Sequence, residues 1–250
     1  MPDFSGLLQG PEWVVFFCCA LLIGMSKTGL PNIGTLTVPV FALLFGAKNS
    51  TGVVLPMLCM ADLLAVIYYR KKFHRELVFG PMPWALLGLM TALVLGHVVP
   101  ESGFRVMMAG CILLGIGTMF ASSRTEKLEL LTTSRWFAPF IGLALGFSTM
   151  IGNAAGPILT VYLLAMRLPK FAFVATGAWF IMILNYLKIP LQLFVWDNIT
   201  TAGFLLDLTA LPFIVLGGFI GIQMVKVIPE QQFKRLMICL TVIATLILLI

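Results

Sequence analysis

Long apolar runs alternate along the chain with short polar or glycine-rich stretches. A helix needs about 20 apolar residues to cross the hydrocarbon core of a bilayer. Ten apolar segments can be marked out, at residues 13–28, 33–45, 52–69, 81–98, 105–121, 136–151, 154–166, 171–195, 202–225 and 233–250. The pattern predicts an all-α polytopic membrane protein with about 8–10 membrane segments.

The second and seventh segments are too short for a comfortable crossing, and each follows a break in the apolar pattern. The first break is Gly29-Leu30-Pro31-Asn32, and the second lies around Gly152-Asn153. Short, interrupted segments in matching positions of two halves indicate a binding site at membrane depth. Whether these segments cross fully or turn back as re-entrant hairpins is left open by their length.

The two halves repeat short motifs in the same order. The motif that begins at Gly24 returns at Gly146, an offset of 122 residues, and Pro100-Glu101 returns as Pro229-Glu230, an offset of 129. Thr51-Gly52 returns as Thr176-Gly177 between them. Because each half has five segments, an odd number, we expect inverted-topology repeats. The predicted divisions are a first repeat at 1–121, a cytoplasmic linker at 122–135 and a second repeat at 136–250.

Composition supports the membrane assignment. The chain has 250 residues, of which 60% are hydrophobic and 10% charged. A soluble domain carries about 25% charged residues and could not hide this much apolar surface in one core. The net charge of +6 does not indicate a nucleic-acid partner, because the basic residues lie in short clusters between apolar runs.

The basic clusters predict the orientation. Arg70, Lys71, Lys72 and Arg75 form the densest cluster, and basic loops stay on the cytoplasmic side. Counting segments from that loop puts the linker inside and both termini outside. The first basic residue is Lys27, so the leading segment lacks the positive start of a secretory signal and is expected to remain as a span.

The two breaks should meet, because unpaired backbone groups cannot face lipid. The helix that follows each break offers free N–H groups and a positive dipole end, which favour an anion. We predict a substrate site from residues at both breaks, namely Ser26, Lys27, Thr28, Gly29, Asn32, Ser148, Thr149, Gly152, Asn153 and Ala154. The alternative is that the glycines there only allow close helix packing.

Three further side chains are expected near the middle of the bilayer. Asp62 corresponds to Asn185 at an offset of 123, and Lys188 lies three residues beyond Asn185, on the same helical face. Charged residues at this depth are costly and usually functional. Lys27 would supply a counter-charge for an anion, or snorkel to the interface. Asp62 would pair with Lys27 or Lys188, take up a proton, or form a structural pair, whereas Asp207 is expected at the interface.

Other kinds of site are absent from the sequence. Ser26 and Ser148 lack the G-x-S-G context of intramembrane serine proteases, and Asp62 and Asp207 lack G-x-G-D. There is no P-loop, no H-E-x-x-H and no C-x-x-C pair among the five cysteines. We therefore expect no enzyme activity, no cofactor and no metal site, and transport driven by a gradient.

Three stretches resemble the signatures of the TauE/SafE sulfite-exporter family. They are Gly24 to Pro31, Asn49 to Pro56 with Asp62 and the basic loop, and Gly146 to Pro157. The resemblance implies a multi-pass permease of a bacterial inner membrane that exports sulfite, sulfoacetate or related anions. The family often has Gly-Gly-Gly in both signatures, whereas this chain has Asn32 and Asn153 there, which favours a sulfonate or carboxylate over sulfite.

The combined prediction is a secondary transporter that exports a small sulfur-containing organic or inorganic anion, such as sulfite or sulfoacetate, by alternating access around a midplane site. Its predicted partners are the small anionic substrate and the lipid bilayer, with no nucleic acid. A proton- or sodium-coupled carrier or channel for a non-sulfur substrate is the alternative, and a non-transporting scaffold is a third. The sequence does not distinguish a monomer from a homodimer.

Overall fold

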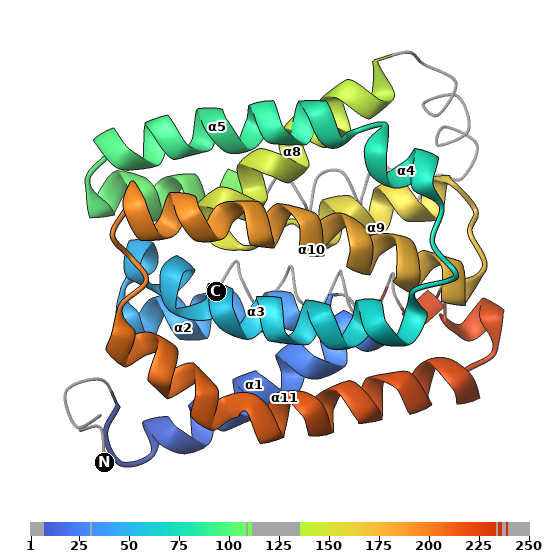
Figure 1. Cartoon of the computed structure of the whole chain (residues 1–250), viewed down its shortest axis with the longest axis horizontal. Helices are drawn as coiled ribbons and strands as arrows, with labels where there is room; N and C mark the ends of the chain where they lie inside the picture. Colours follow the sequence, from blue (N-terminus) through green and yellow to red (C-terminus); the bar gives the residue numbers. More distant parts are fainter. Residues whose placement is uncertain are drawn as a thin grey trace.

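The computed structural model describes residues 8–30, 32–108, 110–111, 136–233, 235–236 and 239, and within them it is helical without strands. The helices lie side by side in one bundle (Figure 1). Within these described residues, four stretches are long and apolar enough to cross a membrane. They are α3 (Ala47–Tyr69), the stretch Arg75–Val98 that comprises α4 (Arg75–Phe79) and α5 (Met82–Val98), α10 (Lys170–Phe194) and α11 (Thr201–Val227). The predicted class, an all-α polytopic membrane protein, is confirmed.

Shorter helices precede the long ones in each half. In the first half these are α1 (Glu12–Thr28), the 3-10 turn η1 (Ile33–Leu36) and α2 (Thr37–Phe45). In the second half they are α8 (Phe137–Gly152) and α9 (Gly156–Ala165). The predicted linker at 122–135, most of the segment at 233–250 and part of that at 105–121 lie outside the described residues.

Two boundaries differ from the sequence-based expectation. Helix α8 continues through Gly152, so the second break occupies residues 153–155. Asn153 ends the helix because it adopts a left-handed φ of 52°, with its N–H bonded to the Thr149 carbonyl. Helix α3 begins at Ala47, five residues earlier than expected, because Gly46 at a φ of 85° turns the chain directly into the helix.

Each half-helix before a break packs against a long helix of the other half. Helix α1 lies along α11, and α8 lies along α5 (Figure 1). A Cβ at Gly217 would lie 2.0 Å from the Leu21 carbonyl oxygen, and one at Gly146 would lie 1.8 Å from the Ala85 carbonyl oxygen. Both interfaces therefore require glycine, as close helix packing in membranes often does.

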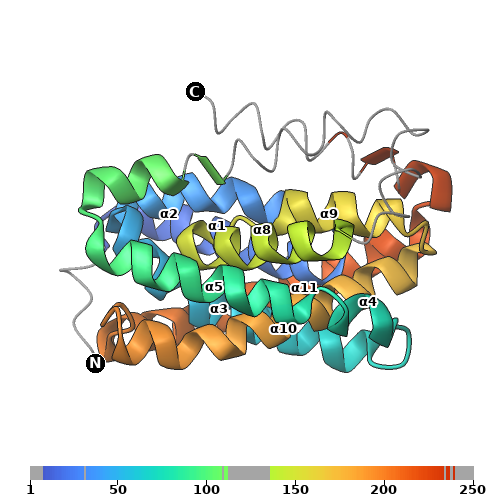
Figure 2. The same cartoon turned by 90° about the horizontal axis from the view of Figure 1, so that it is seen from above.

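The broken helices bring their breaks toward the middle of the bundle. Helices α2 and α9 lie toward opposite ends of the long axis in both views, and η1 contacts α9 (Figures 1 and 2). Figure 2 also shows α3 and α10 together on the other side of the bundle, and these two helices pack against each other. This arrangement encloses the space between the two breaks.

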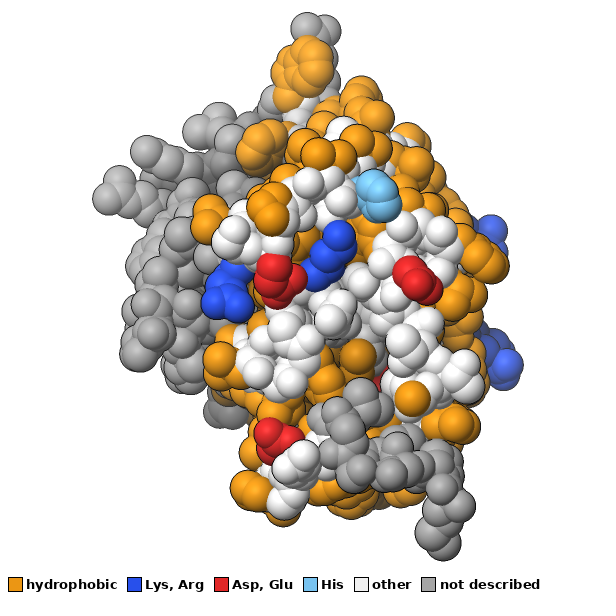
Figure 3. All heavy atoms as spheres, turned by 90° about the vertical axis from the view of Figure 1, so that its left-hand side faces the viewer, with side chains coloured by type: hydrophobic (Ala, Val, Ile, Leu, Met, Phe, Trp, Pro, Cys, Tyr) orange, Lys and Arg blue, Asp and Glu red, His pale blue; other side chains and the backbone are white. Residues whose placement is uncertain are grey.

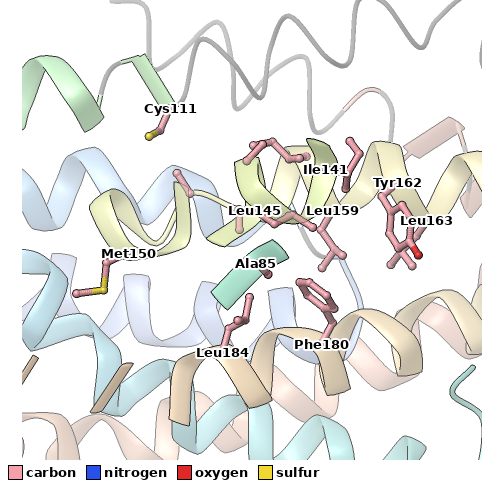
Figure 4. Packing of buried hydrophobic residues seen from close by; sticks show 14 of the residues in the cluster. Ala85, Cys111, Ile141, Leu145, Met150, Leu159, Tyr162, Leu163, Phe180 and Leu184 are labelled. Atoms are coloured by element: carbon pink, nitrogen blue, oxygen red, sulfur yellow. The ribbon is translucent and has the colours of Figure 1, made fainter. Parts of the chain in front are cut away.

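Apolar cores lie on both sides of that space. One contains Leu145, Leu159, Phe180 and Leu184, which converge from α8, α9 and α10 (Figure 4). The other gathers residues of α1, α2, α3 and α11 around Phe16, Phe41, Met57 and Leu206. The breaks are held between two packed bodies and not on a lipid-facing surface.

The outer surface is apolar along the bundle and polar at its end. Large apolar side chains such as Leu43, Val94 and Phe219 are exposed, as a lipid-facing surface requires. Figure 3 shows charged side chains on one end face, with hydrophobic side chains around them. His97, Glu101 and Asp197 are exposed where α5 and α10 end, which suits a water-facing end of a membrane bundle.

Candidate functional site

A small cavity of about 80 Å³ lies between the two breaks. It is much smaller than the ~300–1,000 Å³ pockets that take drug-sized ligands. Polar lining comes from Ser26, Lys27, Thr35, Asp62, Thr149, Asn153, Thr160 and Asn185, and the small residues Gly34, Ala155 and Gly156 also line it. The apolar lining includes Ile23, Leu58, Leu159, Leu163, Phe173, Val174 and Ile181. Its size and polar lining suit a small polar solute.

Lys27 and Asp62 form an ion pair at the wall of this cavity. The Lys27 Nζ lies 2.8 Å from the Asp62 Oδ1, and the lysine side chain is 15% exposed whereas the carboxylate is fully buried. Asn185 donates from Nδ2 to the other carboxylate oxygen at 2.6 Å. Asp62 is therefore held from two sides, and Lys27 reaches the cavity and not the membrane interface.

Lys188 lies next to the cavity without lining it. Its fully buried ammonium donates to the Thr149 carbonyl at 2.8 Å, to Asn153 Oδ1 at 2.5 Å and to Asn185 Oδ1 at 3.1 Å. The Thr149 hydroxyl lies 3.3 Å away. These oxygens belong to neutral groups, and Thr149 lies in the last turn of α8, where the helix dipole is negative. The ammonium thus joins α8, the second break and α10.

The helix starts at the two breaks differ. Gly34 and Thr35, from η1, and Gly156, the first residue of α9, line the cavity. The first N–H groups of an α-helix have no partner within it, so α9 presents those of Gly156 and Ile158 at this end. The first break is followed by a four-residue 3-10 turn before α2. The positive end of an α-helix dipole therefore points at the cavity mainly from α9, in the second half.

Three of the predicted site residues in the first half shape the break without lining the cavity. The Thr28 hydroxyl donates to the Gly24 carbonyl at 3.1 Å and the Gly218 carbonyl at 2.8 Å. Gly29 packs on Gly221, since a Cβ there would lie 2.5 Å from that carbonyl oxygen. The buried Asn32 accepts a hydrogen bond on Oδ1 from the Thr160 hydroxyl at 3.0 Å.

Three predicted site residues of the second half likewise lie at their break without lining the cavity. Ser148 is buried and donates to the Ala154 carbonyl at 3.2 Å, which closes the turn around the break. Ala154 is itself buried, and a Cβ at Gly152 would lie 3.0 Å from the Met108 Cγ. Six of the thirteen predicted residues line the cavity: Ser26, Lys27, Thr149, Asn153, Asp62 and Asn185.

Sequence reasoning missed Thr35 and Thr160 in the cavity wall. For Thr160 the signal was present, because Gly156, Thr160 and Leu163 are spaced three to four residues apart on one helical face. Thr35 lies in the 3-10 turn, whose geometry differs from the expected α-helix, so its direction was not readable from an α-helical period.

A polar cluster separates the cavity from one end of the bundle. Gln192 donates from Nε2 to the Thr51 hydroxyl at 3.2 Å and accepts on Oε1 from Asn198 Nδ2 at 3.1 Å. Asn153 joins the cavity to this cluster by donating to the Thr51 carbonyl at 3.3 Å. In the opposite direction the cavity wall continues to Leu163 and Phe173, near the facing ends of α9 and α10.

Asp207 was expected at the membrane interface because it lies near an end of its apolar segment, and it is the seventh residue of α11. Its side chain is fully buried, and among the described residues neither carboxylate oxygen has a hydrogen-bond partner. Its neighbours in sequence, Leu206 and Ala210, belong to the apolar core with Phe16. The helix starts at Thr201 and turns this face inward, which the apolar run alone did not reveal.

An all-helical membrane bundle with a polar cavity between two helix breaks defines a polytopic membrane protein built around an internal site. The family model described as Sulfite exporter TauE/SafE matches residues 16–248, nearly the whole chain. The protein therefore belongs to the TauE/SafE sulfite-exporter family, whose members are membrane transporters of anions and not enzymes. No curated protein and no solved structure matches the chain.

Proposed function

We propose that the protein is a secondary transporter that exports a small sulfur-containing anion, such as sulfite or sulfoacetate, from a bacterial cytoplasm. The observation that carries this proposal is the ammonium of Lys27 at the wall of a small buried cavity. A cation at this depth is costly unless a counter-charge is present. Asp62 supplies that counter-charge in this structure, and a bound anion would replace it at Lys27 during part of a transport cycle.

The charge balance of the site favours an anion. Lys27 and Lys188 bring two ammonium groups, and Asp62 brings one carboxylate. With all three ionised, the site carries one excess positive charge, which a monoanion neutralises. The Gly156 end of α9 adds the partial positive charge of a helix N-terminus. Hydrogen sulfite matches this excess charge, whereas sulfoacetate, a dianion at neutral pH, would leave one negative charge for that helix end to offset.

Two matching interfaces support an inverted-repeat mechanism of alternating access. Gly217 packs on the Leu21 carbonyl, and at the equivalent positions Gly88 packs on the carbonyl of Leu143, with a Cβ-to-oxygen distance of 2.1 Å. The offsets are the same 122 and 129 residues that relate the sequence motifs. Such reciprocal packing is what duplicated halves related by a two-fold axis would produce, and rocking of one half against the other would alternate access.

The cavity is enclosed unequally at its two ends, and this supports a gating model. Thr51, Gln192 and Asn198 form hydrogen bonds across one end. The other end is lined by apolar residues that include Leu163 and Phe173, close to the basic residues at 167 and 170. On the orientation expected from the basic loops, the polar cluster is the closed outer gate and the apolar end faces the cytoplasm.

A carrier coupled to protons or sodium, for a substrate without sulfur, is the second candidate. Asp62 favours it, because a buried carboxylate that lines the cavity is a natural place to receive a cation. The two candidates differ in what drives the flux. If substrate efflux requires an inward proton or sodium gradient and is insensitive to the anionic charge of the substrate, the second candidate replaces the first.

Proteoliposomes test the proposed function. Vesicles that contain the purified full-length protein are loaded with sulfite, thiosulfate, taurine, sulfoacetate or acetate, and efflux is followed after dilution. We expect protein-dependent efflux of at least one sulfur anion, well above that of acetate and of protein-free vesicles. A folded protein that releases none of these sulfur anions faster than protein-free vesicles would contradict the proposal.

A further inference from the structure

The oxygens around the Lys188 ammonium form a cage of the kind that binds alkali cations. They are the Thr149 carbonyl and hydroxyl, Asn153 Oδ1 and Asn185 Oδ1, at 2.5–3.3 Å from Nζ. Carbonyl oxygens are hard ligands suited to hard cations. In membrane carriers, unwound carbonyls and the C-terminal ends of half-helices coordinate sodium. All these oxygens belong to neutral groups, so the cage adds no net charge of its own.

The place of this cage in the fold also suits a cation. Thr149 lies in the last turn of the half-helix α8, so the negative end of the helix dipole points at the ammonium. Asn153 follows in the break, with the left-handed backbone that ends the helix. The ammonium itself comes from α10, a different helix, and is fully buried.

Comparison with the first half shows that each break holds one cation by a different route. Under the offsets of the repeated motifs, Thr149 corresponds to Lys27 and Asn185 to Asp62. In the first half these positions form a direct ion pair at 2.8 Å. In the second half both are neutral, and the ammonium of Lys188 bridges them. The position that corresponds to Lys188 in the first half is Ala65.

We propose that Lys188 is a tethered replacement for a bound monovalent cation, and that the cage at the end of α8 is a sodium site occupied by this ammonium. The chain would then need no free cation at the second break. Removal of the lysine side chain beyond Cβ would open the cage to sodium and water. This inference goes beyond the proposed function, because it concerns cation binding and holds whichever solute is carried.

Thermal unfolding of the purified full-length protein tests the inference without any transport assay. Wild type, Lys188→Ala and Lys188→Met are compared in sodium chloride and in choline chloride at equal ionic strength. We expect wild type to unfold at the same temperature in both salts. Lys188→Ala should unfold about 3–6 °C higher in sodium at roughly ten times the dissociation constant of the ion. Lys188→Met should show no such difference, because its side chain fills the cage.

Lys170→Ala is the matched control. The Lys170 ammonium also donates to a main-chain carbonyl, that of Ile228, at 2.5 Å, but it lies near the end of the bundle. Water can replace it there, so no sodium response is expected. A sodium response of wild type, an equal response of Lys188→Met, or a Lys188→Ala protein that sodium stabilises no more than choline would overturn the inference. Failure of Lys188→Ala to fold in either salt would overturn it too, since sodium should restore the missing charge.

Discussion

Lys27 of α1 and Asp62 of α3 form an ion pair, with Nζ 2.8 Å from Oδ1. Both residues line the cavity that the two breaks enclose, and the carboxylate is buried. The carboxylate is tied to Asn185 on its other oxygen, so the lysine is the more mobile partner. An arriving anion would compete with Asp62 for the same ammonium. This competition would let the site bind its substrate and still release it.

Lys27→Met should weaken anion binding sharply and slow efflux while the protein still folds. A hydrogen bond to a charged group contributes about 1.5–3 kcal/mol, which corresponds to roughly a 10- to 100-fold loss of affinity. Lys27→Arg keeps the charge and should retain part of the flux. Efflux from proteoliposomes measures both. Lys72→Met, in the basic loop where the ammonium lies over the Phe171 ring, is the control that should leave efflux unchanged. Equal efflux from Lys27→Met and wild type would remove Lys27 from the site.

Asp62→Asn should bind the anion several-fold more tightly and transport it more slowly. The neutral amide no longer competes for Lys27, yet its oxygen still accepts from Asn185. Titration calorimetry gives the affinity, and efflux gives the rate. If the variant binds the anion more weakly than wild type, Asp62 does not compete with the anion for Lys27 and does not help to release it.

Gly146→Ala and Gly217→Ala should each destabilise the protein. The added methyl would lie 1.8 Å and 2.0 Å, respectively, from a backbone oxygen of the facing helix, and overpacking costs about 1–3 kcal/mol. Gly110→Ala is the control, because a Cβ there meets nothing within 4 Å among the residues that the structure describes and alanine favours a helix. Melting temperatures in detergent measure the effect. Similar melting temperatures for all three variants would contradict the close packing of α1 on α11 and α8 on α5.

Gln192→Ala should open the polar cluster. The change leaves the Asn198 amide and the Thr51 hydroxyl without their bonds to this side chain, and a lost partner of this kind costs about 1–3 kcal/mol. Access to the cavity is reported by a cysteine at position 26 (Ser26→Cys) in a background without the five native cysteines. We expect this cysteine to react faster with an impermeant thiol reagent added outside when Gln192→Ala is present than when Gln192 is kept. Leu191→Ala, next along α10, is the matched control. Unchanged labelling would mean that this cluster is not the outer gate.

The sequence predicted the place of the cavity better than it predicted which side chains line it. Composition and segment lengths were enough for the membrane class, and the glycine-rich breaks marked where the cavity lies. The pairing of Asp62 with Lys27 was one of several alternatives, since periodicity cannot tell which of two nearby lysines reaches a carboxylate. Thr28 and Asn32 are used for packing because their partners, Gly218 and Thr160, come from distant helices. Such contacts depend on tertiary packing, which no local pattern contains.

A structure of the protein with its transported anion tests the central claim most directly. Crystals are soaked with the sulfur anion that the efflux panel selects, and the anomalous scattering of its sulfur locates it. We expect one peak in the cavity, with oxygens of the anion within hydrogen-bond distance of Lys27 Nζ and the Gly156 N–H. An anion bound elsewhere in the protein, with this cavity empty, would contradict the account.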